Sequence, residues 1–115
     1  MNKEQNLPDG ITQEMLTEAK RKHRSVKTAE LLDAEGNHIG FILVGNPSTF
    51  IQNEWEKYID KDLQRAKGIL INGCVPCAEH KEMIKNFEKN SDEYMAVFDA
   101  CAKMLPVGKS ILKNV

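Results

Sequence analysis

Cys74 and Cys77 form the sharpest chemical signal in this sequence of 115 residues, in the run Cys74-Val75-Pro76-Cys77. Two thiols with two residues between them can close a strained disulfide or share one metal ion. Pro76 restricts the backbone between the thiols, and a helix after them would lower the pKa of the first thiol through its N-terminal dipole. The pair indicates dithiol redox chemistry or a metal site; the simplest alternative is two reduced thiols in a turn.

The redox interpretation depends on the segments around the cysteine pair. If Ile69-Leu70-Ile71 forms a buried strand, then the order strand, cysteine pair and helix resembles the active site of thioredoxin-like proteins. That fold also needs a further pair of strands and a cis-proline loop after the cysteines. The short chain after Cys77 instead has helical periodicity over about half its length. We therefore keep a small cytoplasmic dithiol redox protein as an alternative and expect no enzymatic activity.

His80 adds an imidazole to the two thiols and completes a Cys-x2-Cys-x2-His series. Thiolate and imidazole are ligands that zinc prefers, and this spacing is usable. A closed structural site needs a fourth ligand, for which Cys101 is the candidate. Cys101 lies in the apolar stripe of the last predicted helix, however, where a buried cysteine packs as a small hydrophobic side chain. We expect no cofactor, with a structural zinc ion at Cys74, Cys77 and His80 as the alternative.

A basic run over residues 20–24, with Lys27 close behind, could contact nucleic-acid phosphates. Positive side chains near a helix C-terminus also complement the helix dipole while facing solvent, which explains the run without a ligand. The formal net charge is −1 and aromatic residues make up 6% of the chain. The chain therefore has neither an attractive field for nucleic acid nor a surface for base stacking. We expect no nucleic-acid partner, and the role of the basic run stays open.

Apolar runs in the sequence are short. The longest covers residues 39–44, far fewer than the roughly 20 residues that span a bilayer. Residues 1–6 are polar and lack the apolar stretch of a signal peptide. We therefore expect no membrane association and a cytoplasmic location, where thiols stay reduced.

The whole pattern predicts one small α+β domain with an N-terminal helix, one antiparallel β-hairpin and then three to four α-helices. We expect residues 1–10 to form a flexible tail and residues 11–115 to form this single domain. The hairpin strands are predicted at residues 26–33 and 38–44, with a glycine-containing turn between them. The second strand is apolar on both faces, so we expect both of its faces to be covered.

Polar residues and glycines mark the expected ends of the helices. Thr12 is a good N-cap for the first helix, because its hydroxyl can accept a hydrogen bond from an orphan backbone N–H. Asn46 is predicted to cap a helix whose first position is Pro47. Asn72-Gly73 is predicted to end the next helix, and Asn90 to cap the last one.

The order of these elements resembles the small prophage-encoded tail-assembly chaperone-like proteins of long-tailed bacteriophages. The resemblance covers residues 11–114 and depends on element order, lengths and scattered residue types. The segments that carry it are Ile11-Thr12-Gln13-Glu14-Met15-Leu16, Asp33-Ala34-Glu35-Gly36-Asn37, Asn46-Pro47-Ser48-Thr49, residues 62–71 running into Asn72-Gly73-Cys74-Val75, Phe98-Asp99-Ala100-Cys101-Ala102 and Leu112-Lys113-Asn114. Residues 74–80 depart from the family, which has an aromatic residue, glycines and an acid there.

The resemblance implies a non-enzymatic protein of the bacterial host cytoplasm. Such proteins bind the long, aggregation-prone tape-measure protein and help to assemble the phage tail around it. Apolar stripes on the last two helices suit helix-in-groove contact with a tape-measure-like partner, and the candidate partner-binding residues are Phe87, Tyr94 and Phe98. The partner's identity stays open, as does homo-oligomerisation through the hairpin.

Overall fold

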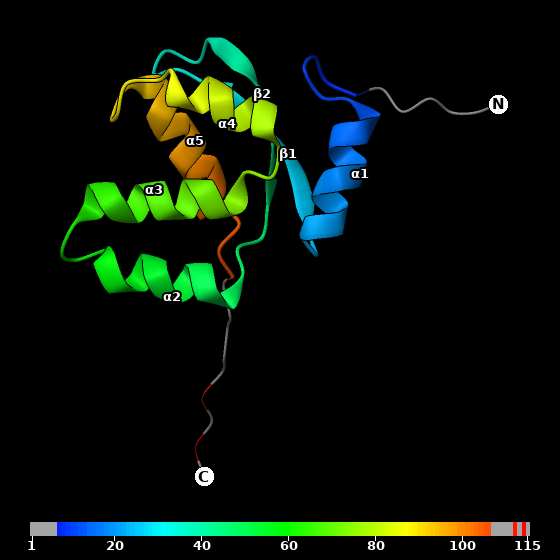
Figure 1. Cartoon of the computed structure of the whole chain (residues 1–115). Helices are drawn as coiled ribbons and strands as arrows, with labels where there is room; N and C mark the ends of the chain where they lie inside the picture. Colours follow the sequence, from blue (N-terminus) through cyan, green and yellow to red (C-terminus); the bar gives the residue numbers. More distant parts are fainter. Residues whose placement is uncertain (1–6, 107–111, 113, 115) are drawn as a thin grey trace.

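The computed structural model describes residues 7–106, 112 and 114 of the chain. Within these residues, five α-helices accompany one antiparallel hairpin, which confirms the predicted α+β class (Figure 1). The elements are α1 (Gln13–Lys22), β1 (Val26–Leu32), β2 (His38–Gly45), α2 (Thr49–Tyr58), α3 (Leu63–Cys74), α4 (Ala78–Lys85) and α5 (Asp92–Ala102).

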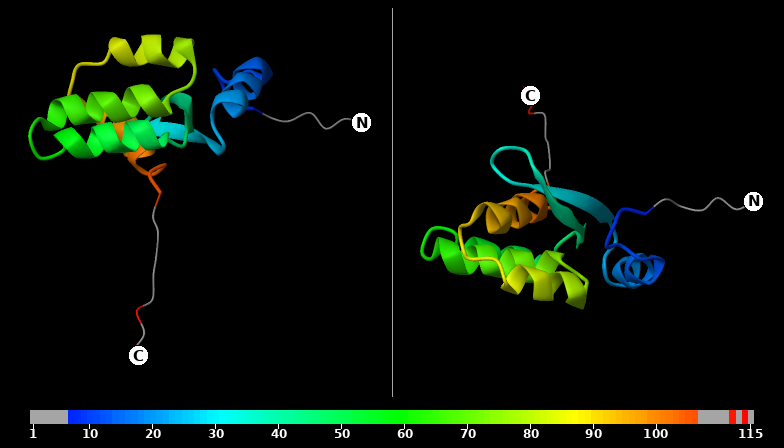
Figure 2. Two further views of the ribbon diagram at one scale, coloured as in Figure 1. Left: turned by 60° about the horizontal axis from the view of Figure 1, so that its bottom comes forward. Right: turned by 90° about the horizontal axis from the view of Figure 1, so that it is seen from above.

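The hairpin separates α1 from the other helices (Figures 1 and 2). Neighbouring strand residues alternate between the two sides. Ile42 packs in the main core with residues of α2 to α5, whereas Leu43 packs in a smaller cluster with α1. Both side chains are fully buried. The prediction that both faces of the second strand are covered is therefore confirmed.

The start of α2 differs from the prediction. Ser48 caps this helix, with its side chain accepting a hydrogen bond from the N–H of Ile51, so Pro47 precedes the helix. The side chain of Asn46 is engaged elsewhere, because its Oδ1 accepts a hydrogen bond from the N–H of Ser25 at 2.8 Å. Asn46 thus joins the two ends of the hairpin, a tertiary contact that local sequence does not reveal.

The prediction that Asn72-Gly73 ends a helix is wrong, because α3 continues to Cys74. Gly73 permits close packing of α3 on α2. A Cβ at this position would lie 2.6 Å from Cγ2 of Ile51. Residues 69–71 are consequently helical, and the strand that a thioredoxin-like active site requires before its cysteines is absent from this part of the chain.

The cap of α5 is Ser91, whose hydroxyl accepts a hydrogen bond from the N–H of Tyr94 at 3.2 Å. Asn90, the predicted cap, lies one residue earlier in the left-handed region, with φ at 68°. Asparagine tolerates this conformation better than most residues with a side chain. Its Oδ1 accepts a hydrogen bond from Nζ of Lys67, a lysine buried between α3 and α5, at 3.2 Å.

The described part of the predicted N-terminal tail, residues 7–10, contacts the domain. Leu7 packs against the small cluster beneath α1, and Gly10 turns the chain with φ at 84°. Residues 1–6 lie outside the described residues. Among the helices of the described chain, none has both the length and the apolar character needed to cross a membrane.

Candidate functional site

Cys74 and Cys77 lie in two different apolar clusters. Cys74 ends α3 and is buried in the main core, where its Sγ lies 3.9 Å from the carbonyl oxygen of Cys101. Cys77 precedes α4 and packs in the small cluster with α1 and Leu43. All three cysteines are buried free thiols. The structure therefore does not bring the predicted dithiol together as one exposed reactive pair.

Cys77 and Cys101 have environments that favour the neutral thiol. Burial raises the pKa of Cys77, and the charge of Glu79 raises it further. A hydrogen bond with Cys74 raises the pKa of Cys101, and burial raises it further. Because the thiolate is the nucleophile in dithiol exchange, the raised pKa of Cys77 disfavours that reaction.

His80 lies buried between β2 and the N-terminal segment. Its Nδ1 accepts a hydrogen bond from the N–H of Leu43 at 3.4 Å, and its Nε2 lies 3.4 Å from the carbonyl oxygen of Gly10. Burial lowers the pKa of His80, so the neutral ring that this pair of contacts requires is favoured. In the described part of the chain, no three histidine, cysteine, aspartate or glutamate side chains are grouped to hold a metal ion. Cys74 and Cys77 pack in separate clusters, and His80 contacts Leu43 and Gly10.

The basic run over residues 20–24 lies at the C-terminal end of α1 and is largely exposed, as the dipole interpretation predicts. Three of its side chains make contacts within the chain, and that of His23 places its Nδ1 2.8 Å from the carbonyl oxygen of Asn46. Arg21 forms an ion pair with Glu18 at 2.9 Å, and Nζ of Lys22 donates a hydrogen bond to the carbonyl of Pro76 at 3.2 Å. Lys22 thereby ties α1 to the turn between α3 and α4.

An open groove of about 510 Å³ lies between α3 and α4. Aliphatic and aromatic side chains make up much of its lining. Its apolar residues are Gly68, Ile71, Ala78, Ile84, Phe87 and Tyr94. At Gly68, a Cβ would meet no atom within 4 Å, so this position in α3 leaves open space along the groove. The groove is large enough to take several side chains of another molecule.

The groove also has a positive border. Lys81, Lys85 and Lys89 line it, against a single glutamate, Glu82. Glu82 lies 3.9 Å from Nζ of Lys85 in an exposed pair, which leaves the border with a surplus of positive charge. An apolar groove with a positive border along α4 and the loop after it matches a ligand that has an apolar face and an acidic edge.

Two of the three predicted partner-binding residues meet in this groove. Phe87 is half-buried and Tyr94 is almost fully buried, and both line it. Phe98 does not line it, because its ring packs against Trp55 with centroids 5.7 Å apart. The sequence interpretation missed the lysine border. The four-residue spacing of Lys81 and Lys85 was the available signal, because that spacing places both on one helical face.

A scan against protein-family models and searches of curated proteins and of solved structures find no match to this chain. The described chain combines a small α+β domain with an open, lysine-bordered apolar groove between two helices.

Proposed function

We propose that this protein is a non-enzymatic binding protein whose groove between α3 and α4 receives the apolar face of an amphipathic helix from a protein partner. The observation that carries the proposal is the meeting of Phe87 and Tyr94 in one open groove. Helix-in-groove recognition uses apolar anchors one turn apart, which such a groove can accommodate. Gly68 supports it further, because the missing side chain allows a helix backbone to approach α3 closely.

The charges around the groove specify the edges of the proposed partner helix. Lys81, Lys85 and Lys89 favour glutamate or aspartate on the side of the partner's apolar stripe that lies along α4. Exposed charges of this kind affect association rate and specificity more than affinity. The apolar anchors therefore supply most of the binding free energy, and the lysines orient the helix.

The proposed partner is a tape-measure-like protein in the cytoplasm of a bacterial host. The basis is the resemblance in element order to tail-assembly chaperone-like proteins of long-tailed phages. A long helical protein without its assembly partners exposes amphipathic faces that aggregate. A small domain that covers such faces transiently would keep the tape-measure protein soluble until the tail forms.

Co-expression tests this function. The tape-measure protein encoded in the same genome is produced alone, with the wild-type chain and with a Phe87→Ala variant. We expect the wild-type chain to keep the tape-measure protein soluble and to co-purify with it, and Phe87→Ala to lose most of this effect. Phe50→Ala is the matched control, because Phe50 is 69% exposed on α2 and does not line the groove.

Two results would contradict different parts of the proposal. A tape-measure protein that stays insoluble with the wild-type chain would contradict the proposed partner. Equal solubility with Phe87→Ala and with the wild-type chain would contradict the proposed groove. The double variant Lys81→Glu/Lys85→Glu changes exposed or half-buried charges at the border of the groove, and we expect it to fold and to bind weakly.

A further inference from the structure

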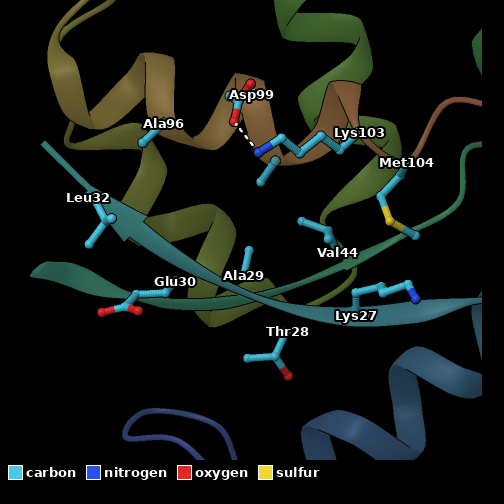
Figure 3. Close-up of a pocket in the computed structure, with 11 residues that line it drawn as sticks. Lys27, Thr28, Ala29, Glu30, Leu32, Val44, Ala96, Asp99, Lys103 and Met104 are labelled. Carbon is cyan, nitrogen blue, oxygen red and sulfur yellow. Dashed lines mark ion pairs between the residues drawn. The ribbon is translucent and has the colours of Figure 1, made fainter. Parts of the chain in front are cut away.

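The hairpin lies between two parts of the protein that differ in size. Figure 3, which views the cavity of about 490 Å³ between β1 and α5, shows that Ala29 of β1 points toward α5 and that Thr28 points away from it. Ala29 accordingly packs against the main cluster, whereas Leu43 of β2 packs in the small cluster with α1. Because successive strand residues lie on opposite faces of the sheet, the backbone of the hairpin separates the two clusters.

The packing beneath α1 is small compared with that of the main core. Among the described residues, the small cluster has four buried members and the main cluster has thirteen. Within α1, all of which the structure describes, Ala19 alone is buried, while Met15 and Leu16 are partly exposed. A helix of ten residues is marginal in water without tertiary packing. The stability of α1 therefore depends on a small apolar contact with the hairpin.

Polar contacts add little to this attachment. Nζ of Lys22 donates a hydrogen bond to the carbonyl of Pro76 at 3.2 Å, and Nε2 of His80 lies 3.4 Å from the carbonyl oxygen of Gly10. When α1 moves away, water can hydrogen-bond to the groups that these contacts leave. Exchange with water makes the net contribution of each hydrogen bond small.

His23 marks the boundary of the part that can move. It follows α1 with an extended backbone, and its Nδ1 lies 2.8 Å from the carbonyl oxygen of Asn46 at the far end of the hairpin. Its ring also fills the space that a Cβ at Gly45 would need. The chain from His23 onward is thus fixed on the hairpin, whereas α1 precedes this anchor.

Cys77 is the thiol beneath α1. It is 6% exposed and packs in the small cluster with Ile11 and Ala19. Cys74 and Cys101 are instead fully buried in the main core. Movement of α1 alone would therefore uncover one of the three cysteines and leave the other two covered.

We propose that α1 and the segment leading into it open from the hairpin as one unit while the main core stays folded, and that this opening exposes Cys77. Local units of low stability open in this way without global unfolding. The opening also uncovers an apolar face of the hairpin that includes Leu43, with Val26 and Phe41 beside it. It does not involve the groove between α3 and α4 and is independent of the function proposed for that groove.

The labelling rates of the three cysteines in the full chain test this opening. The native protein is treated with N-ethylmaleimide for increasing times, and mass spectrometry of its peptides measures the modified fraction of each cysteine. We expect Cys77 to react at least about tenfold faster than Cys74 and Cys101, because a local opening costs less free energy than global unfolding. Low concentrations of urea should accelerate Cys74 and Cys101 more steeply than Cys77, because global unfolding exposes more surface.

Two matched variants distinguish the local opening from global unfolding. Ala66→Gly weakens the main core, since Ala66 is a fully buried residue of α3. It should accelerate the labelling of Cys74 and Cys101 about fivefold and leave Cys77 unchanged. Ala19→Gly weakens α1 at its buried residue and should accelerate Cys77 about fivefold. It should accelerate the other two cysteines as much, because global unfolding includes the opening of α1.

Three results would overturn the proposal. Equal labelling rates for the three cysteines of the wild-type chain would show that α1 and the main core open together. Acceleration of Cys77 by Ala66→Gly, to the same extent as Cys74, would show the same. A Cys77 rate that Ala19→Gly does not change would show that the reagent reaches this thiol without movement of α1. If Ala66→Gly does not fold, the wild-type rates and Ala19→Gly still decide between these outcomes.

Discussion

The ring of His80 and the backbone of Leu43 are joined by a hydrogen bond of 3.4 Å between the Leu43 N–H and Nδ1 of the imidazole. This contact covers the outer edge of β2 with a side chain from α4, and the other ring nitrogen reaches Gly10. A residue that the sequence offers as a zinc ligand thus joins three segments far apart in the chain. The hydrogen bond requires an unprotonated Nδ1, which makes the contact sensitive to pH.

His80 should make the protein less stable in mild acid. Burial lowers its pKa in the folded chain below the ordinary value of 6.5, so the unfolded chain binds the proton first as the pH falls. The contribution of this neutral histidine is complete above about pH 7 and decreases as the pH falls below 6.5 toward the folded-state pKa. Urea unfolding followed by Trp55 fluorescence, at about pH 7.5 and pH 5.5, measures the difference.

We expect His80→Gln to be less stable than the wild-type chain at about pH 7.5, and to show a smaller loss between the two pH values. His38→Gln is the control, because His38 is exposed and contacts only the surface carboxylate of Glu30 among charged partners. It should retain the wild-type loss of stability in acid. A wild-type stability that rises on acidification would show that His80 is not held in its neutral form.

The three cysteines should react slowly with thiol reagents in the folded protein. Cys74, Cys77 and Cys101 are buried, and the raised pKa values of Cys77 and Cys101 reduce their reactive thiolate. Titration with a chromogenic disulfide should detect three thiols promptly after denaturation without reductant, and far fewer at first in the native protein. If two thiols appeared only after reduction, Cys74 and Cys77 would be paired and the redox interpretation would return.

Two glycines in α3 should respond oppositely to replacement by alanine. Gly68→Ala should stabilise the protein by about 0.5–1 kcal/mol, because alanine has the higher helix propensity and the new Cβ meets no atom within 4 Å. Gly73→Ala should destabilise it by about 1–3 kcal/mol, because its Cβ would press on Ile51 of α2. Chemical unfolding of both variants measures the contrast. Equal effects would mean that α2 and α3 do not pack as closely as the structure shows.

Much of the fold is predictable from local pattern. The glycine-containing turn before the apolar residues 39–44 predicts the hairpin, and the cap at Thr12 predicts the first helix, because both signals act over a few residues. The wrong predictions involve residues whose roles are set by distant partners. The local sequence predicts Asn46 as a helix cap, but its side chain accepts a hydrogen bond from Ser25. It predicts Gly73 as a helix end, but Gly73 packs within α3 against Ile51 of α2.

The candidate site was less predictable than the fold. Phe87 and Tyr94 were identifiable as members of apolar stripes, and both line the groove. Membership of a stripe does not distinguish a residue of the groove wall from a residue of the core. Phe98 belongs to the same stripe as Tyr94 but packs on Trp55 instead. The separation of Cys74 from Cys77 depends on where α3 ends. Each lies at one end of the short link between α3 and α4, and the two helices carry them into different clusters.

We propose that the groove between α3 and α4 binds an acidic amphipathic helix. Fluorescence anisotropy with two synthetic helical peptides tests this binding. Both peptides have leucines on one face; glutamates flank these leucines in one peptide, and lysines flank them in the matched control. Gly68→Leu provides a blocked groove, since a side chain there enters open space instead of the core. Amide chemical shifts then show where the peptide lies.

We predict that the glutamate peptide binds at least about tenfold more tightly than the lysine peptide. Changes in amide chemical shift should concentrate on α3, α4 and Tyr94. Gly68→Leu should abolish binding while the protein stays folded. Equal affinity for the two peptides, unchanged binding to Gly68→Leu, or shifts centred on another surface would contradict the assignment of this groove as the binding site.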